Sequence, residues 1–289
     1  MMLGLHVRSG GGVEHAPGRA AAEGGETVQI FAGSPRMWKQ PTYSREQGEK
    51  FTAAMEEHGL AEAFIHVMYL TSYGTADEEH RRKSTQAFIT ALENCDTLGA
   101  RGAVTHLGSH KGEGFEVALP RIRDCLMEVL ASDTEAEVIL ENSAGAGDLI
   151  GGTFEELGRI IGACDNHPRL KICLDTAHAF TSGYDLRTGE AWEQLLSQFD
   201  DTIGLDRLSV LHLNDSMHDI NTYKDRHENI GDGYIGYEAF RAIVNDTRFN
   251  DMSAVLEVPG IENKGPDKEN LTRLKGLVNE QSRSANHDT

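Results

Sequence analysis

The sequence has 289 residues, of which 39% are hydrophobic and 25% charged, an ordinary balance for a chain with one full-sized core. No run of about 18 apolar residues occurs and no basic segment followed by an apolar one opens the chain, so we expect no membrane association and a cytoplasmic protein. The formal net charge of −19 argues against nonspecific attraction to nucleic acid and fits either an ordinary acidic enzyme or adaptation to concentrated salt.

Salt titration separates these two interpretations of the charge. At about 1 M salt, screening acts over about 3 Å and removes most self-repulsion. Adaptation to salt therefore predicts an unfolding midpoint that rises as KCl is increased from dilute to molar concentrations.

The four cysteines, Cys95, Cys125, Cys164 and Cys173, form no C-x-x-C pair, and we expect reduced, mostly buried thiols.

Eight short β-rich apolar stretches recur along the chain. They are LGLHV (3–7), TVQIF (27–31), AFIHV (63–67), AVTHL (103–107), EVILE (137–141), KICLD (171–175), SVLHL (209–213) and AVLEV (254–258). From Phe31 onward, equivalent positions are separated by 34 to 45 residues. Such gaps are too long for hairpins and are typical of crossovers that contain a helix.

The segments between these strands have helical patterns. The segment 44–59 begins with Ser44 as a cap, has Gln47 three residues later, and ends at Gly59. A segment at 120–132 opens with Pro120 at a predicted helix start, and one at 153–164 opens with the capping box of Thr153 and Glu156. Further helices are predicted within 77–100, 190–200, 236–246 and 267–278.

Eight strands alternating with helices indicate parallel pairing with right-handed crossovers. A closed (β/α)8 barrel, the TIM barrel, fits better than an open doubly wound sheet, because no G-x-G-x-x-G follows an early strand. No linker or shift in composition divides the chain. We therefore predict a single α/β domain over residues 1–278 and a polar, disordered tail over 279–289.

The predicted strand ends carry residue types that bind metals. These are His66, His106, Glu141, Asp175, His212 and Glu257. A single histidine at a strand end is usually an ordinary core or rim residue, and His6 on the first strand could either support the others or simply pack. Six donors on successive strands meet at one face of a barrel, where burial without cations would leave carboxylates and imidazoles unpaired. The sequence therefore predicts a metal site.

Three further candidates, His178, Asp225 and His227, lie just past strand ends, and Asp225 and His227 can point the same way if their segment is extended. Nitrogen and oxygen donors without a thiolate suit zinc, and manganese or iron are compatible with the same donor types. Nine donors are too many for one four-coordinate ion. Two or three ions about 3.5–4 Å apart are the usual device for phosphodiester hydrolysis.

The same residues lie in motifs that resemble the endonuclease IV family of apurinic/apyrimidinic endonucleases. The motifs are LENSAGAG (140–147), CLDTAHAFTSGYD (173–185), HLNDS (212–216) with KDRHENIGDGYIG (224–236), and the weaker GLHVRSGGG (4–12) and LEVPG (256–260). The similarity covers about residues 3–278. It implies a TIM barrel with three zinc ions that cleaves double-stranded DNA on the 5′ side of abasic sites and leaves a 3′-hydroxyl.

The resemblance also implies a role for each donor. One zinc would take His66, His106 and Glu141, a second would share Glu141 and add Asp175, His212 and Glu257, and the third would take His178, Asp225 and His227. Glu141 and Glu257 would be the catalytic residues, with Glu141 helping to hold or activate the attacking hydroxide. The third ion would stabilise charge on the departing oxygen.

The resemblance implies DNA contacts from two loops. In SPRMWK (34–39), Arg36 and Trp38 match a family loop that is inserted at the lesion, although ordinary loop packing is an alternative for both, and Tyr69 matches a family tyrosine near the abasic site. Met37 replaces a polar residue that is common in the family, and prolines that often follow the histidines equivalent to His66 and His106 are absent. We expect a monomer.

Two other functions remain open from the sequence. A barrel sugar isomerase or epimerase would use one or two manganese-type ions, held by two glutamates, an aspartate and a histidine. A non-enzymatic module that binds damaged DNA would use zinc structurally, in closed sites without open coordination positions. The third set of donors, His178, Asp225 and His227, argues against the isomerase.

Overall fold

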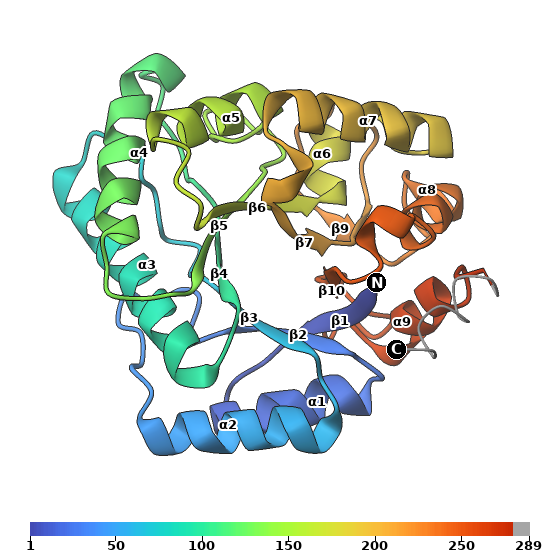
Figure 1. Cartoon of the computed structure of the whole chain (residues 1–289). Coiled ribbons are helices and arrows are strands. Elements are labelled where there is room, and N and C mark those ends of the chain that lie inside the picture. Colours follow the sequence, from blue (N-terminus) through green and yellow to red (C-terminus); the bar gives the residue numbers. More distant parts are fainter. Residues whose placement is uncertain (280–289) are drawn as a thin grey trace.

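Eight parallel strands close into a barrel around the centre of the molecule (Figure 1). This computed structural model describes residues 1–279, so the tail predicted for 279–289 lies outside the described residues except for its first position. The barrel strands are β1 (Met2–Val7), β2 (Thr27–Phe31), β3 (Glu62–His66), β4 (Gly102–Thr105), β5 (Glu137–Glu141), β6 (Leu170–Asp175), β7 (Leu208–His212) and β10 (Ser253–Leu256). The predicted (β/α)8 fold is confirmed, and every predicted strand is present within two residues of its expected bounds.

Helices surround the barrel on its outside (Figure 1). They are α1 (Ala16–Ala22), α2 (Arg45–His58), α3 (Glu78–Leu98), α4 (Phe115–Leu130), α5 (Phe154–Ala163), α6 (Thr176–Ser182), α7 (Gly189–Thr202), α8 (Gly236–Val244) and α9 (Lys268–Lys275), with short 3-10 turns at Val13–His15, Leu205–Arg207 and Thr247–Phe249. Among residues 1–279, none of these helices has the length and apolar character needed to cross a membrane.

Most helix boundaries follow from the capping signals in the sequence. The capping box of α2 forms as predicted, with Ser44 accepting from the Gln47 N–H and Gln47 accepting from the Ser44 N–H, and Gly59 ends the helix in the left-handed conformation at φ 66°. The box predicted for α5 is only half formed. Thr153 accepts from the Glu156 N–H at 3.2 Å, but the Glu156 carboxylate accepts from Gly151 at 2.8 Å instead.

The predicted start of α4 at Pro120 is wrong, because the helix begins at Phe115 and Pro120 lies inside it. Proline lacks the N–H that would donate to the carbonyl of Glu116 four residues earlier. Both Glu116 and Pro120 are exposed, so water can reach that turn of the helix. The helix therefore begins five residues before the proline, which its exposed turn tolerates.

Three elements were not predicted. Helix α1 lies between β1 and β2, α6 begins directly after the last residue of β6, and a two-stranded hairpin of β8 (Asp215–Ser216) and β9 (His227–Glu228) folds the polar loop after β7. Asp175 caps α6 by accepting from the N–H of His178 at 2.8 Å, so one carboxylate ends a strand and starts a helix.

All four cysteines are buried free thiols, as expected.

The barrel interior contains a fully buried layer directly beneath the strand ends. It consists of Phe64, Val104, Ile139, Cys173, Val210 and Val255. Each of these residues precedes one of the six predicted strand-end donors by two positions, so the alternation of a strand places both on the inner face. The apolar layer therefore forms the floor of the donor cluster. Burial raises the pKa of Cys173 to about 12, so its thiol stays neutral in this floor.

A polar cluster lies near the amino-terminal ends of the strands. Arg101, which precedes β4, donates to Glu62 at 3.0 Å and to Glu137 at 3.2 Å. Ser253 donates to Glu62 at 2.6 Å, and Ser209 donates to Glu137. One guanidinium thus pairs with carboxylates from β3 and β5, in a cluster that is only partly exposed to solvent.

The change Arg101→Met should lower the free energy of unfolding by about 1–3 kcal/mol, because two partly buried carboxylates lose their shared partner. The matched control is Arg45→Met, since Arg45 pairs with Glu49 on an exposed helix face, where such a pair contributes about 0.3–0.5 kcal/mol. Urea unfolding of both variants tests this. Equal losses in the two variants would show that the cluster adds no more than a surface pair.

Candidate metal centre

The register of the barrel brings the six strand-end donors to one face. Asp175 at the end of β6 pairs directly with His212 at the end of β7, and His212 pairs with Val255, two residues before Glu257. Parallel strands in register place their carboxyl ends at one rim, as expected for the active face of such a barrel. The predicted donors therefore meet in space.

These donors form three groups that share members. Within each group, one atom per residue lies within 4.8 Å of the others, and the groups are His66 with His106 and Glu141, then Glu141 with Asp175, His212 and Glu257, and finally Asp175 with His178 and His227. Asp225, which we predicted in the third group, lies with its carboxylate 3.3 Å from His178 and 3.8 Å from His227. The structure thus brings all nine predicted donors together and places Asp175 between two groups.

Four of the five donor histidines are held through one ring nitrogen by an oxygen acceptor and face a carboxylate with the other, and the held Nδ1 of His178 also lies 3.2 Å from Glu141. The holding contacts are His66 Nδ1 to the Val67 carbonyl at 2.7 Å, His178 Nδ1 to the Asn142 carbonyl at 3.0 Å, His227 Nδ1 to the Glu257 carbonyl at 3.3 Å, and His212 Nε2 to the Gln29 side-chain oxygen at 3.0 Å. A carbonyl oxygen only accepts, so each of these nitrogens carries a hydrogen. The opposite nitrogen of a neutral ring then presents a lone pair, which is the arrangement of metal-binding histidines.

The electrostatics of the cluster fit divalent cations. Burial raises the pKa of Glu141, but His106 and His212 outweigh it and hold this pKa well below its usual range. Burial lowers the pKa of His178, but Asp175 and Asp225 outweigh it and hold this pKa well above its usual range. The carboxylates thus stay ionised and attract positive charge. Among residues 1–279, the buried Nε2 of His227 finds no hydrogen-bond partner, and it lies 3.6 Å from Asp175, as expected of a nitrogen that donates to a metal.

Several polar residues that sequence reasoning missed hold the carboxylates in place. Asn214 donates to the Asp175 carboxylate at 2.6 Å and accepts from the Glu257 N–H at 2.8 Å. Asn142 accepts from the Asp175 N–H at 2.7 Å. Both asparagines follow predicted donors within two residues, in LEN and HLN, so their proximity in sequence was an available signal.

The cluster is closed on the barrel side and open on the loop side. Glu141, Asp175 and His212 are completely buried, whereas the side chain of His106 is 28% exposed and that of Asp225 is 51% exposed. The side of His106 and Asp225, where the loops after the strands lie, is therefore the more open approach for a substrate.

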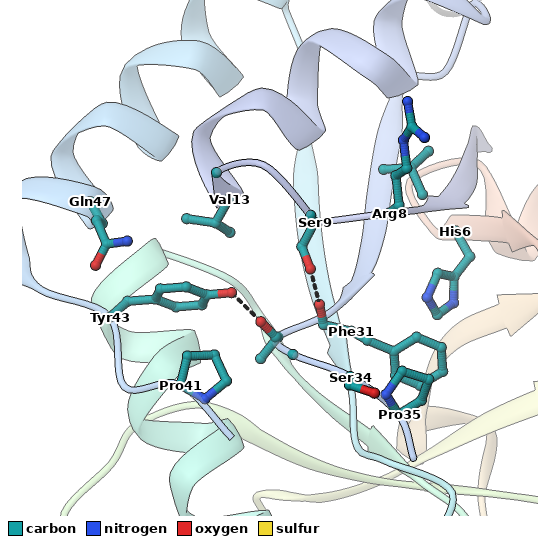
Figure 2. A pocket seen from close by; sticks show the side chains of 15 residues that line it. His6, Arg8, Ser9, Val13, Phe31, Ser34, Pro35, Pro41, Tyr43 and Gln47 are labelled. Carbon is teal, nitrogen blue, oxygen red and sulfur yellow. Dashed lines mark hydrogen bonds between the residues drawn. The ribbon is translucent and has the colours of Figure 1, made fainter. Parts of the chain in front are cut away.

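A cavity of about 650 Å³ adjoins this centre between the loops that follow β1 and β2 (Figure 2). His6 and Phe31 line it on the side of the metal centre, with their rings 4.5 Å apart. Ser9 donates to the Phe31 carbonyl at 2.6 Å, and Tyr43 donates to the Ala32 carbonyl. These bonds fix both loops to the end of β2, so the cavity has a defined shape beside the donors.

The three predicted DNA-contacting residues differ in exposure. Arg36 and Tyr69 are exposed on neighbouring loops, which are joined by a hydrogen bond from the Tyr69 N–H to the Pro35 carbonyl at 3.1 Å. The Tyr69 ring lies 6.1 Å from the His66 ring, next to the centre. Trp38 is half-buried and packs edge-on against His80 at 5.2 Å, so its ring supports its loop.

Known proteins are similar to this chain over nearly its whole length. Residues 17–277 match the family described as "Xylose isomerase-like TIM barrel". A protein of Chloroflexus aurantiacus named "Probable endonuclease 4" is 38% identical over 278 residues, which cover 96% of this chain and 98% of that protein. The crystal structure of endonuclease IV from Thermus thermophilus superposes with a TM-score of 0.84 at 32% identity and covers 96% of this chain and 98% of that one.

Sugar epimerases share the fold at lower similarity. The crystal structure of a D-tagatose 3-epimerase-like protein superposes with a TM-score of 0.73 at 20% identity, covering 97% of this chain and 99% of that one. At this identity the likeness shows a common barrel and nothing about chemistry.

Proposed function

Since this chain belongs to the endonuclease IV family, we propose that it is a metal-dependent endonuclease that hydrolyses the DNA backbone 5′ to abasic sites and leaves a 3′-hydroxyl. The observation that carries the proposal is the convergence of nine histidine, aspartate and glutamate side chains at the open rim of the barrel. The presence of a third donor group, with His178, Asp225 and His227, favours phosphodiester hydrolysis over the sugar epimerase chemistry of other barrels.

We propose three zinc ions as the metals, with manganese or iron as compatible occupants of some positions. The three donor groups would hold one ion each, with Glu141 shared by two of them and Asp225 completing the third. When bound, such ions supply an activated water and positive charge against the phosphate oxygens. The four carboxylates of the site, Glu141, Asp175, Asp225 and Glu257, carry fewer negative charges than three divalent ions carry positive ones, so the loaded centre would attract a phosphate.

Glu141 and Glu257 are the proposed catalytic residues. Glu141 presents Oε2 to His66 and His106 and Oε1 to His178 and His212, so it lies between the donor groups. Burial raises the pKa of Glu257, but His212 and His6 outweigh it and hold this pKa well below its usual range. Both side chains therefore stay ionised and can accept hydrogen bonds from a water molecule, which orients it toward phosphorus. No covalent protein intermediate is needed.

Arg36 and Tyr69 are proposed to contact the DNA, and Trp38 is proposed to support the loop from which Arg36 projects. Arg36 and Tyr69 are exposed on adjacent loops, and the Tyr69 ring lies beside His66, so a DNA strand lying across the barrel mouth would meet them. Met37, which follows Arg36 in the sequence, is 57% exposed and can fill a gap in the base stack as an apolar wedge. Trp38 would act by holding this loop in position, in keeping with its contact to His80.

A nicking assay tests the proposed function. A duplex oligonucleotide with one abasic analogue should be cut once, on the 5′ side of the analogue, and the product should prime a DNA polymerase because it ends in a 3′-hydroxyl. Cleavage should stop after a strong chelator removes the metal and return when zinc is restored. An undamaged duplex is the control. Equal cutting of both duplexes, or cutting that persists without metal, would refute the proposal.

The salt dependence of DNA binding should be shallow. Three divalent ions change the formal net charge only from −19 to −13, since they add six positive charges, so attraction must come from the centre and a few exposed cations such as Arg8, Arg36 and Lys224. Neutralising few phosphates gives a small slope, and we expect affinity for an uncleavable abasic duplex to fall less than about 100-fold between about 50 and 200 mM salt. Fluorescence anisotropy measures this. A loss of about 10³-fold or more, as for six to ten phosphate contacts, would contradict it.

A further inference from the structure

A glutamine lies at the middle of β2 with its side chain completely buried inside the barrel. Gln29 is flanked on the same face of the strand by Thr27 and Phe31, within the largely apolar stretch TVQIF. Burial of a primary amide is costly unless both ends of the amide form hydrogen bonds. The partners of Gln29 therefore explain why it is there.

Both ends of this amide bind proposed metal donors. Gln29 Nε2 lies 2.7 Å from Glu257 Oε1, and Gln29 Oε1 lies 3.0 Å from His212 Nε2. The amide orientation is fixed by chemistry, because an ionised carboxylate only accepts and must face the NH₂ group. One side chain from β2 thus links donors that come from β7 and from the end of β10.

The first consequence concerns His212. The Gln29 oxygen only accepts, so His212 Nε2 must carry the hydrogen, and the neutral ring then has its lone pair on Nδ1. That nitrogen faces Glu141 at 3.3 Å and Glu257 Oε2 at 3.5 Å. His66 and His178 are held in the opposite way, through Nδ1 to backbone carbonyls. His212 therefore differs from both in the nitrogen that it offers to a metal.

The second consequence concerns Glu257. Its Oε1 accepts from Gln29 and also lies 2.8 Å from Nδ1 of His6, a residue of β1. Both hydrogen bonds point to the same oxygen, so Oε2 is the atom left to face His212 and the donor group. Gln29 and His6 thus determine which carboxylate oxygen is available to a metal.

We propose that Gln29 is a positioning residue of the metal centre, which fixes His212 as an Nδ1 donor and Glu257 as a donor through a single oxygen. This inference rests on the proposed metal-dependent function, and it adds a residue that binds neither metal nor DNA. Partners of this kind typically change metal affinity by about 10- to 100-fold when they are removed.

The variant Gln29→Met tests the proposal, because methionine is unbranched and of similar size but forms neither hydrogen bond. Zinc affinity, measured by competition with a chromophoric chelator, should fall about 10- to 100-fold for the site that contains His212 and Glu257. In the protein loaded with cobalt, the visible absorption bands should shift. The matched control is Thr27→Val on the same strand, which removes one partly buried hydrogen bond, from the Thr27 hydroxyl to the Glu62 carbonyl, that involves none of the nine donors. Thermal unfolding of both variants shows how much of any effect is structural.

A measurement on the unaltered protein tests the same role of Gln29 if the variant Gln29→Met does not fold. In the zinc-loaded protein with ¹⁵N-labelled histidine, NMR should find His212 with a hydrogen on Nε2 and metal on Nδ1, and His66 and His178 with the reverse arrangement. Zinc on Nε2 of His212 would overturn the proposal, as would native zinc affinity and native cobalt bands in Gln29→Met. If the NMR pattern holds but abasic DNA is not cut, the proposed function fails and the role of Gln29 stands.

Discussion

Replacement of Glu257 by glutamine should abolish cleavage of abasic DNA while the barrel stays folded. The reason is that Glu257 Oε1 already accepts two hydrogen bonds, from His6 Nδ1 at 2.8 Å and from Gln29 Nε2 at 2.7 Å. A carboxamide in this place must turn its oxygen toward these two N–H groups. Its NH₂ group then replaces Oε2, and an NH₂ group cannot bind a metal or accept a hydrogen bond from water.

We expect the change Glu257→Gln to lower kcat for nicking by about 10³-fold or more, the size seen when a preorganised charged group is lost from a reacting centre. Elemental analysis should show less metal in the variant, and the unfolding midpoint of the metal-free proteins should differ little. The matched control is Glu262→Gln, which removes the same charge from the exposed segment just after β10. Turnover within about tenfold of the native value, with metal still bound, would remove Glu257 from the catalytic set.

The sequence was sufficient to predict the barrel and the position of its centre because both follow from short-range periodicity. Alternation along a strand puts residues two apart on one face, and parallel pairing then brings the strand ends to one rim. The positions of Glu141, Asp175 and His212 at strand ends follow from this rule alone. The apolar residues two positions earlier, which form the floor of the centre, follow from the same rule.

The supports of the centre could not be predicted, because they depend on contacts between distant strands. Gln29 lies 183 residues from His212 and 228 from Glu257, and nothing in TVQIF distinguishes a bridging amide from a tolerated polar residue. The position of Asp175 between two donor groups was missed for a similar reason. A carboxylate has two oxygens, and only the fold decides whether they face one group or two.

Replacement of Asp215 by alanine should disrupt the third donor group from a distance. Asp215 lies in the hairpin after β7 and is completely buried. Its Oδ1 accepts from the N–H groups of Ser216 and Ile235, and its Oδ2 accepts from those of Gly231, Gly233 and Gly236, at distances between 2.8 and 3.3 Å. A single carboxylate thus holds both ends of the loop that carries Asp225 and His227.

The local sequence is adapted to this arrangement. A Cβ atom at Gly233 would lie 2.4 Å from Asp215 Oδ1, and Gly231 has a φ of 86°, which L-residues rarely adopt. The backbone therefore wraps closely around the carboxylate. Hairpin pairing of Ser216 with His227 then transmits this order to the donor. The loop owes the position of His227 to Asp215, even though Asp215 is not one of the nine donors.

We expect Asp215→Ala to lower the free energy of unfolding by at least about 3 kcal/mol, because five buried or partly buried N–H groups lose their acceptor and each can cost about 1–3 kcal/mol. Zinc content should fall by about one equivalent as His227 and Asp225 lose their places, while His66, His106 and Glu141 keep their metal. Asp219→Ala is the control, since Asp219 is exposed in the same loop and accepts only locally, from the Ile220 N–H. Urea unfolding and elemental analysis of the two variants test this prediction. Full zinc content and an unchanged unfolding midpoint in Asp215→Ala would contradict it, because the bound metal would then order the loop without the Asp215 carboxylate.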